Sequence, residues 1–188
     1  MINCILAGIQ FLLLLAAVGM ILYMGYVMQS FKNPVPYVPT DKKTIKKMIA
    51  VAKIKQGDKV IDLGSGIGKI VFAVAKHHTG EVIGIEKSRL LFSISRLWAL
   101  LKKGKGKIKF VRGDFTKYPL GNINIVMCFL TPEGILSIEE KLTKELLKGA
   151  MILSYMFPIE NIRGFKETKI PLKEKKKTNY LFVYNKLY

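Results

Sequence analysis

A short apolar run that passes into a glycine-rich turn constrains the fold of this chain more than any other stretch. The run is Val60–Leu63, and the turn contains Gly64, Gly66 and Gly68. Glycine is favoured where the backbone takes positive φ or must approach a ligand closely. Such a turn delivers the chain to a helix N-terminus, whose free N–H groups and dipole favour negatively charged groups. The stretch therefore predicts a strand, a turn and a helix that together form a nucleotide-type pocket.

The spacing of the glycines distinguishes two kinds of nucleotide turn. Dinucleotide folds use G-x-G-x-x-G, whose third glycine allows close packing of helix on strand. Counted from Gly64 and Gly66, that glycine would fall at Lys69, but Gly68 comes one residue early. The pattern from Asp62 is Asp-x-Gly-x-Gly-x-Gly, which resembles motif I of class I (seven-strand) S-adenosylmethionine-dependent methyltransferases. In that family the turn passes under the amino-acid part of the cofactor, so the resemblance implies S-adenosylmethionine. A dinucleotide site and a glycine turn without a ligand are the alternatives.

Apolar runs and helical patterns alternate along the chain after residue 40, which is typical of a parallel sheet covered by helices. The sequence predicts strands over 59–63, 81–86, 108–112, 123–129 and 151–155. It predicts helices over 41–52, 69–76, 88–101 and 135–147. We expect Thr40 to cap the first of these helices and Trp98 to lie in the core. Two last strands, 165–172 and 180–187, would form an antiparallel pair. The expected fold is α/β, a Rossmann-like seven-strand methyltransferase sheet with helices on both faces.

Acidic residues stand where three successive predicted strands end. Asp62 precedes the turn, Glu86 closes the second strand, and Asp114 follows the third. In open α/β sheets the ligand binds at the carboxyl ends of the strands, where an acidic side chain can accept hydrogen bonds from ribose hydroxyls. A surface carboxylate is the alternative for Glu86. The family resemblance implies that Asp114 accepts from the adenine amino group and that Phe115 packs on the base. The predicted cofactor-binding residues are Asp62, Gly64, Ser65, Gly66, Gly68, Glu86, Asp114 and Phe115.

The segment after the fourth predicted strand lines the acceptor site in methyltransferases of this class. Enzymes that act on amide or adenine nitrogen typically carry Asn/Asp-Pro-Pro-Tyr there, whereas this chain has Phe129-Leu130-Thr131-Pro132. That difference argues against an adenine or glutamine target. Tyr37 and Phe129 are weak candidates for a catalytic role, and Tyr155 and Phe157 are further candidates for an aromatic wall. Ordinary core packing is the alternative for each of them, and the sequence identifies no general base.

An uncharged apolar stretch, Ile2–Met28, opens the chain. As a helix it would extend roughly 40 Å, against about 30 Å for the hydrocarbon core of a bilayer, so a tilted single-pass helix fits. A signal peptide and a buried core helix are the rivals, but Met1-Ile2-Asn3 lacks the positive charge of a signal peptide. We therefore expect a transmembrane anchor over 1–30, a proline-rich linker over 31–40 and a methyltransferase domain over 41–188.

Lysines after the apolar stretch predict its orientation. They are Lys32, Lys42, Lys43, Lys46 and Lys47. The positive-inside rule then places the domain on the cytoplasmic side, and the same lysines would lie against anionic lipid headgroups. The expected partners are the lipid bilayer and a protein substrate at or near it.

The charge of the whole chain is strongly positive. It carries 31 basic against 13 acidic residues, for a net charge of +18. Such a surface attracts nucleic acid, anionic lipid or acidic protein. Only four of the basic residues are arginine, the preferred side chain for bidentate phosphate and base contacts, so nucleic acid is possible but not favoured. The two cysteines, Cys4 and Cys128, are far apart, and we expect neither a metal site nor a disulfide.

Taken along its length, the chain resembles the small membrane-anchored protein-lysine methyltransferases. That family includes the mitochondrial enzymes that modify the c-ring protein of the ATP synthase and the adenine nucleotide translocase, with archaeal relatives. The segments that carry the resemblance, beside the apolar helix, are Pro36–Thr40, Asp62–Gly66, Gly84–Glu86, Phe129-Leu130 and Ser154–Phe157. The resemblance implies methyl transfer to protein lysine. An RNA methyltransferase, a methyltransferase for a lipid or another membrane-soluble acceptor, and a non-enzymatic scaffold are the alternatives.

Overall fold

The computed structural model describes residues 2–32, 40–102, 104–173 and 178–188. The chain divides into two compact units, Met1–Pro36 and Tyr37–Tyr188. The first unit is the helix α1, Ile2–Lys32. Its segment Ile5–Gly25 has a mean hydropathy of 2.6, and none of it is buried. Twenty-one residues of helix extend about 32 Å, the thickness of a hydrocarbon core. A membrane span and a signal sequence both fit this length and composition.

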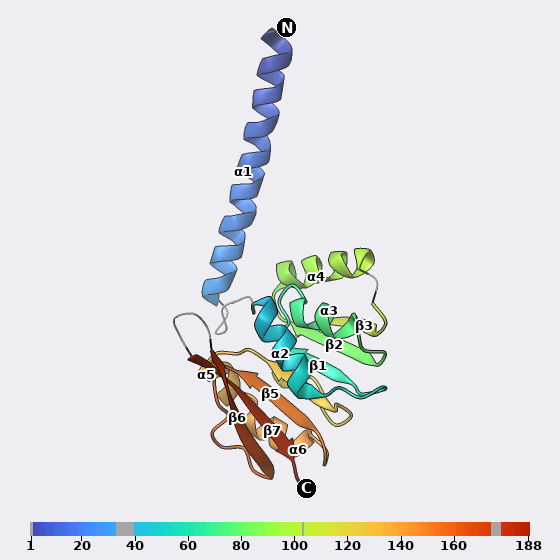
Figure 1. Ribbon diagram of the computed structural model, residues 1–188. Helices are drawn as coiled ribbons and strands as arrows, with labels where there is room; N and C mark the ends of the chain where they lie inside the picture. Colours follow the sequence, from blue (N-terminus) through green and yellow to red (C-terminus); the bar gives the residue numbers. More distant parts are fainter. Residues whose placement is uncertain (1, 33–39, 103, 174–177) are drawn as a thin grey trace. The chain divides into compact units, whose positions relative to one another are not determined.

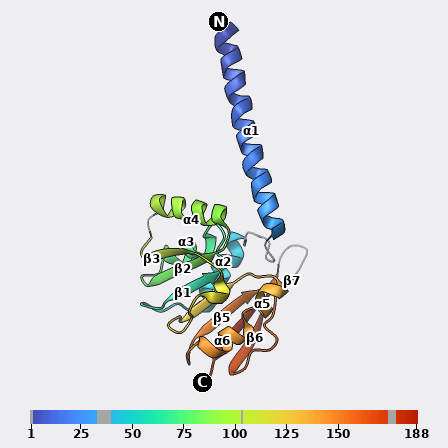
Figure 2. The same ribbon diagram turned by 180° about the vertical axis from the view of Figure 1, so that it is seen from behind.

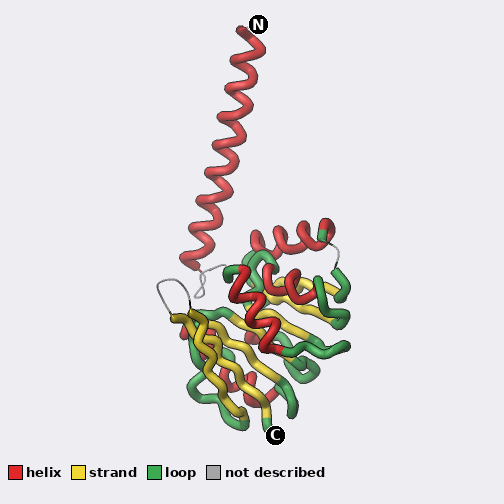
Figure 3. The backbone as a smooth tube through the Cα atoms, in the orientation of Figure 1, coloured by secondary structure: helices red, strands yellow, loops and turns green. Residues whose placement is uncertain are grey.

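A single seven-stranded sheet forms the centre of the second unit, with the order β3-β2-β1-β4-β5-β7-β6 (Figures 1 and 3). The strands are β1 Val60–Leu63, β2 Glu81–Glu86, β3 Lys107–Arg112, β4 Ile125–Cys128, β5 Met151–Tyr155, β6 Phe165–Lys173 and β7 Thr178–Lys186. Strands β1 to β5 pair in parallel, and β7 runs antiparallel to both β5 and β6. The predicted α/β fold and its antiparallel end are confirmed.

Helices cover both faces of this sheet, as expected. Their bounds are α2 Lys42–Ala52, α3 Lys69–Ala75, α4 Arg89–Leu101, α5 Pro132–Leu136 and α6 Glu139–Glu145, with a 3₁₀ turn η1 at Phe115–Lys117. Right-handed crossovers place α3 and α4 on one face and the connections after β3 and β4 on the other. Figure 1 shows α2 and α3 in front of the sheet, and Figure 2, which views the protein from behind, shows α5 and α6 in front of it.

The core explains why the central strands are apolar throughout. Every residue of β1 and β4 is buried, because both faces of a central parallel strand are covered by helices. Met48 of α2 and Val71 of α3 pack with Met127 and Leu153 of the sheet in one cluster. This rigid centre fixes the positions of the loops at the two edges of the sheet.

The predicted helix over 135–147 is wrong in its bounds, because the structure has two short helices there. Helix α5 begins earlier, at Pro132, where proline suits the first helical position and Thr131 Oγ1 accepts a hydrogen bond from Gly134 N at 3.3 Å. The Ser137 hydroxyl donates to the Gly134 carbonyl oxygen at 2.7 Å. Ile138 then leaves helical geometry with φ −123°. Helix α5 therefore ends in a tighter turn, in which Ile138 N donates to the Ile135 carbonyl oxygen at 3.0 Å.

Two smaller predictions are also wrong. Asp41, rather than Thr40, caps α2, since its Oδ1 accepts from Lys43 N at 2.8 Å and from Thr44 N at 3.1 Å. Trp98 was expected in the core, but 45% of its surface is exposed. It lies at the margin of the α4 face that packs on the sheet.

Candidate active site at the carboxyl edge of the sheet

The carboxyl ends of β1, β2 and β3 meet at one edge of the sheet. Leu63 pairs with Ile85 across β1 and β2, and Glu86 pairs with Arg112 across β2 and β3. Of the predicted cofactor residues, Asp62 lies one residue before the end of β1, Glu86 is the last residue of β2, and the others follow the ends of β1 and β3. The topology therefore brings the residues around Asp62, Glu86 and Asp114 to the same edge.

The glycine loop turns tightly onto the end of β2. Gly64, Gly66 and Gly68 all have positive φ, at 76°, 55° and 82°, a region that side chains disfavour. The backbone N–H groups of Gly64 and Ser65 both donate to the Ile85 carbonyl oxygen, at 3.0 and 2.9 Å. The loop is thus held by the neighbouring strand before it enters α3.

Gly68 allows α3 to pack closely on the sheet. A Cβ atom at Gly68 would lie 2.5 Å from the Phe110 ring of β3 and 3.0 Å from Phe72 of α3. The two rings contact each other with centroids 5.5 Å apart. The close helix–strand approach that dinucleotide folds achieve with a glycine at the next position is achieved here at Gly68.

Glu86 joins the glycine loop to the start of α4. Its Oε2 accepts from Gly66 N at 2.8 Å, and its Oε1 accepts from Ser88 N at 2.7 Å. The side chain is buried. A carboxylate has about four acceptor positions, so each Glu86 oxygen keeps a lone pair for a further donor. That arrangement fits a pair of ribose hydroxyls.

Asp62 is a buried acid at the same edge. Burial raises the pKa of its carboxyl to about 8, and the neighbouring charge of Glu86 acts in the same direction. A cationic group placed beside these two carboxyls would favour the ionised form. The site therefore suits a ligand with positive charge, as the sulfonium and ammonium groups of S-adenosylmethionine carry.

Ser65 places an unpartnered hydroxyl inside the loop. Its Oγ is buried and has no hydrogen-bond partner among the residues that the structure describes. A Cβ atom at Gly84 of β2 would lie 2.8 Å from this Oγ, so the small residue in β2 makes room for the serine. Sequence inspection could not find this long-range requirement, because Gly84 lies within an ordinary apolar strand.

Asp114 caps η1 with its carboxylate. Its Oδ1 accepts from the Thr116 backbone N–H at 3.0 Å and from the Thr116 hydroxyl at 2.7 Å, while Lys87 Nζ lies 3.3 Å from Oδ2. Burial opposes ionisation, but these hydrogen bonds and the Lys87 charge hold the pKa of Asp114 below its ordinary value. Phe115 is half-buried beside it. The adenine-binding role of both residues stays a prediction.

Aromatic side chains gather at the carboxyl edge of β4 and β5. The rings of Phe129 and Tyr155 meet edge to face with centroids 4.9 Å apart. The Tyr155 hydroxyl accepts a hydrogen bond from Asn179 Nδ2 of β7 at 2.9 Å. Sequence reasoning missed Asn179, because it expected the last strand to begin at Tyr180, two residues after the observed start of β7 at Thr178. Tyr37, the other candidate of this group, lies outside the described residues.

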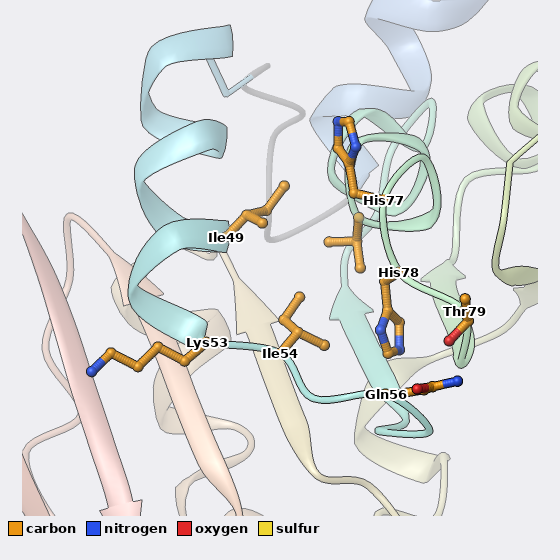
Figure 4. A pocket seen from close by; sticks show the side chains of 8 residues that line it. Ile49, Lys53, Ile54, Gln56, His77, His78 and Thr79 are labelled. Atoms are coloured by element: carbon orange, nitrogen blue, oxygen red, sulfur yellow. The ribbon is translucent and has the colours of Figure 1, made fainter.

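A separate pocket lies at the opposite, amino edge of the sheet (Figure 4). It has a volume of about 490 Å³ and lies between the end of α2 and the end of α3. His78 on its wall donates from Nε2 to the Asp58 carbonyl oxygen at 2.8 Å. That contact gives the buried histidine a structural role. None of the predicted cofactor residues lines the pocket.

Comparison with known proteins identifies the family of the chain. Residues 62–166 match the ANTKMT methyltransferase domain. The chain belongs to this methyltransferase family. A protein-lysine N-methyltransferase of Saccharolobus islandicus is 30% identical over 158 residues, which cover 82% of this chain and 96% of the relative. The adenine nucleotide translocase lysine N-methyltransferase of Mus musculus is 29% identical over 141 residues, 75% of this chain and 61% of the relative. The methyltransferase thus spans less than two thirds of the length of that mouse relative.

A solved structure shares the fold of this methyltransferase. An RNA methyltransferase from Salinibacter ruber, in complex with S-adenosyl-L-homocysteine, superimposes with a TM-score of 0.70 at 23% identity. The match covers 80% of this chain and 94% of the other. The predicted enzyme class, an S-adenosylmethionine-dependent methyltransferase, is confirmed by the family and the fold together.

Proposed function

We propose that this methyltransferase transfers a methyl group from S-adenosylmethionine to lysine side chains of a protein, while α1 holds it at a membrane. The observation that carries the acceptor class is the lysine specificity named for the Saccharolobus islandicus relative, whose match extends over 82% of this chain. The mouse relative is named for lysine methylation as well. Methyl acceptors of other classes lack such support.

The proposed cofactor seat is the carboxyl edge of β1 to β3. The glycine loop from Gly64 to Gly68 supports the amino-acid part of the cofactor, and Asp62 balances its positive charge. Glu86 accepts from the ribose hydroxyls with the lone pairs that Gly66 and Ser88 leave available. Asp114 and Phe115 contact the adenine. The bound cofactor supplies the activated methyl group, and the protein supplies orientation and an enclosed site.

The proposed acceptor site is the aromatic edge formed by Phe129 and Tyr155. A lysine must lose its proton before its Nζ can attack a methyl group. Removal from water disfavours the charged ammonium and lowers the lysine pKa, and the nearby positive charge of the cofactor acts in the same direction. Phe129 contributes to this apolar wall as a positioning residue.

The proposed anchor is α1, with the domain on the cytoplasmic side. Its apolar segment Ile5–Gly25 is long enough to span a bilayer. Helix α2 of the second unit exposes Lys42, Lys43, Lys46 and Lys47 while it buries Ile45 and Met48. Lysines that follow a span favour the cytoplasmic side. An anchor restricts the search for a substrate to the membrane and raises its effective concentration.

Methyl transfer can be tested directly with the full chain in lipid nanodiscs. The enzyme, S-adenosylmethionine labelled in its methyl group and a membrane extract are incubated together, and the labelled products are separated by class. We expect label in protein, recovered as methyl-lysine after hydrolysis, and loss of that label with the Glu86→Ala variant. Label confined to lipid or RNA would overturn the lysine assignment.

Membrane topology requires a separate measurement. In cells, α1 should resist alkaline carbonate extraction, and an added protease should digest the C-terminal domain only after it gains access to the cytoplasm. Extraction by carbonate would contradict the anchor. Digestion from the outside of intact cells would contradict the orientation without affecting the proposed chemistry.

A further inference from the structure

Helix α4 carries a second apolar stripe on the side that faces away from the sheet. Its inner side is buried at Leu91 and Ser95 and packs against β2 and β3. On the other side, apolar residues recur at intervals of four, three and four, which places them on one helix face: Leu90, Ile94, Leu97 and Leu101. An amphipathic surface helix would carry polar residues there.

The C-terminal half of α4 exposes this stripe to solvent. Leu97 is 59% exposed, Leu100 80% and Leu101 76%, and Trp98 beside them is 45% exposed. We call these four residues the α4 patch. Scattered exposed leucines are normal on proteins, but four large apolar residues within five positions form a continuous apolar surface, and such surfaces mark interaction sites.

The surroundings of the α4 patch are basic. Between residues 96 and 109 the sequence has six lysines and arginines and no acidic residue. Arg96, Lys102, Lys105 and Lys107 are exposed around the patch. The Nζ atom of Lys102 lies 4.4 Å from the centroid of the Trp98 ring, so the positive charge reaches the apolar surface itself.

We propose that the α4 patch docks on the surface of an anionic lipid bilayer. Leucines and a tryptophan beside lysines and arginines are the composition of helices that lie in the membrane interface. Their apolar side chains enter the boundary between headgroups and acyl chains, and the long basic side chains reach the lipid phosphates. A second copy of this chain is a poor partner, because the same positively charged surfaces would face each other. The proposal rests on the membrane location of the proposed function and not on its lysine specificity.

Docking through α4 leaves the active-site edge accessible. Helix α4 begins beside Glu86 at the carboxyl edge and ends at the loop that leads to the start of β3, at the amino edge. In this loop Lys105 N and Gly106 N donate to the Ala75 carbonyl oxygen at the end of α3, at 2.8 and 3.1 Å. The exposed leucines therefore lie near the amino edge. A bilayer that covers them leaves the carboxyl edge open at the side, where a lysine near the headgroups can approach.

The chain contains its own probe for this proposal, because Trp98 is its single tryptophan. The full chain is reconstituted into vesicles of phosphatidylcholine alone or mixed with phosphatidylglycerol, each with and without brominated acyl chains. In the anionic vesicles we expect brominated lipid to quench Trp98 fluorescence and acrylamide in the water to lose access to it. The quenching should weaken in phosphatidylcholine alone and at high salt, because the basic residues lose their partners.

A matched pair of variants separates docking from general effects on the protein. Leu97→Ser with Leu101→Ser should shift the docked population by about tenfold or more, since two exposed leucines lose their apolar contact with lipid. Leu147→Ser with Leu187→Ser removes two leucines that are also largely exposed elsewhere (63% and 50%) and should leave the quenching unchanged.

Three results would overturn the proposal. Trp98 that stays accessible to acrylamide and insensitive to brominated lipid is not docked. Protection from acrylamide without quenching by brominated lipid means that protein covers the patch, either a second copy or another part of the chain. Equal quenching in neutral and anionic vesicles at all salt concentrations excludes recognition of anionic lipid. Carbonate extraction of α1 is measured on the same vesicles, so a failed anchor is distinguished from a failed α4 contact.

Discussion

The Glu86 carboxylate accepts a hydrogen bond from the backbone N–H of Gly66 at 2.8 Å, so the end of β2 holds the glycine loop that follows β1. A second hydrogen bond from Ser88 N, at 2.7 Å, fixes the other carboxylate oxygen. The protein thus orders this loop with its own side chain, and a ligand that binds there avoids the entropic cost of ordering it.

Glu86→Gln should weaken both the fold and cofactor binding. A carboxamide nitrogen cannot accept a hydrogen bond, so either Gly66 or Ser88 is left with a buried unpaired N–H, at a cost of about 1–3 kcal/mol in unfolding free energy. We expect affinity for S-adenosylhomocysteine to fall about tenfold or more, by isothermal titration calorimetry of the full chain in nanodiscs.

The control for this variant is at the other end of β2. Glu81 is partly exposed and lies 3.8 Å from Lys59, so Glu81→Gln should change stability by less than about 1 kcal/mol and leave binding intact. Unchanged affinity in both Asp62→Ala and Glu86→Ala would refute the assignment of the cofactor site.

Asp62 should make the stability of the unliganded protein fall as pH rises. In the unfolded chain this carboxyl titrates near 3.8, whereas in the fold its pKa is raised to about 8. Between these values the native state holds a proton that the unfolded state has lost, so raising the pH favours unfolding. Relative to the parent protein, Asp62→Asn should gain on the order of 5 kcal/mol near pH 8 and little near pH 4. Denaturant unfolding across this pH range measures the difference, and parallel curves would contradict it.

The same carboxyl should make cofactor affinity depend on pH. A cation bound beside Asp62 favours its ionised form, so binding releases a proton below the raised pKa of about 8. Affinity for S-adenosylmethionine should therefore increase from pH 6 to pH 8 and then level off. In Asp62→Asn the affinity should vary much less with pH. Calorimetry in buffers of different ionisation enthalpy measures the proton released on binding, which this variant should lack.

Gly68→Ala should destabilise the domain more than an alanine at another glycine of the same conformation. At Gly68 the new Cβ would lie 2.5 Å from Phe110, whereas at Gly57, with φ 87°, no atom lies within 4 Å. Gly57→Ala therefore measures the backbone strain alone, about 1–2 kcal/mol. We expect Gly68→Ala to lose about 2–4 kcal/mol by urea unfolding. Adding Phe110→Leu to Gly68→Ala should recover part of the stability that Gly68→Ala loses beyond Gly57→Ala. Equal losses of unfolding free energy at the two glycines would exclude a steric clash.

Phe129→Leu should separate the acceptor site from the cofactor site. The substitution removes the ring that meets Tyr155 at 4.9 Å but keeps an apolar side chain. Cofactor affinity should stay within about twofold, while kcat/KM for the protein substrate falls about tenfold, a loss of about 1.4 kcal/mol in transition-state stabilisation. Phe165→Leu, at the start of β6 on the amino edge of the sheet, should change neither the cofactor affinity nor kcat/KM. A loss of cofactor affinity in Phe129→Leu would contradict the separation of the two sites.

Local sequence patterns were sufficient for much of the fold. The apolar runs of β2 and β5 have the predicted bounds, since buried parallel strands leave a continuous apolar signal. The break between α5 and α6 was missed because no proline or glycine stands at residues 137 and 138, and apolar residues at helical spacing continue through Ile138 to Leu142. Trp98 was wrongly predicted to be buried, because helical spacing reveals the apolar faces of a helix but does not indicate which face packs on the sheet.

The candidate site shows the same division between local and long-range information. Glycine spacing and the acids at strand ends predicted Asp62 and Glu86 as neighbours, because the topology of a parallel sheet requires it. The contact of Gly68 with Phe110 and the fit of Ser65 above Gly84 could not be predicted, since each joins residues that share no local pattern. Asn179 lies 24 residues after Tyr155 in the sequence and reaches it only through the pairing of β5 with β7.

The hydrogen bond between Gly66 and Glu86 also bears on the order in which the domain folds. It joins residues 20 positions apart, and the strands it links enclose a single short helix. Strand β7 instead lies between β5 and β6, so the sheet cannot be completed until the last residues of the chain are available. Short-range contacts form at a lower entropic cost than distant ones. During synthesis, the glycine loop and its carboxylate can therefore assemble while the C-terminal strands are still being made.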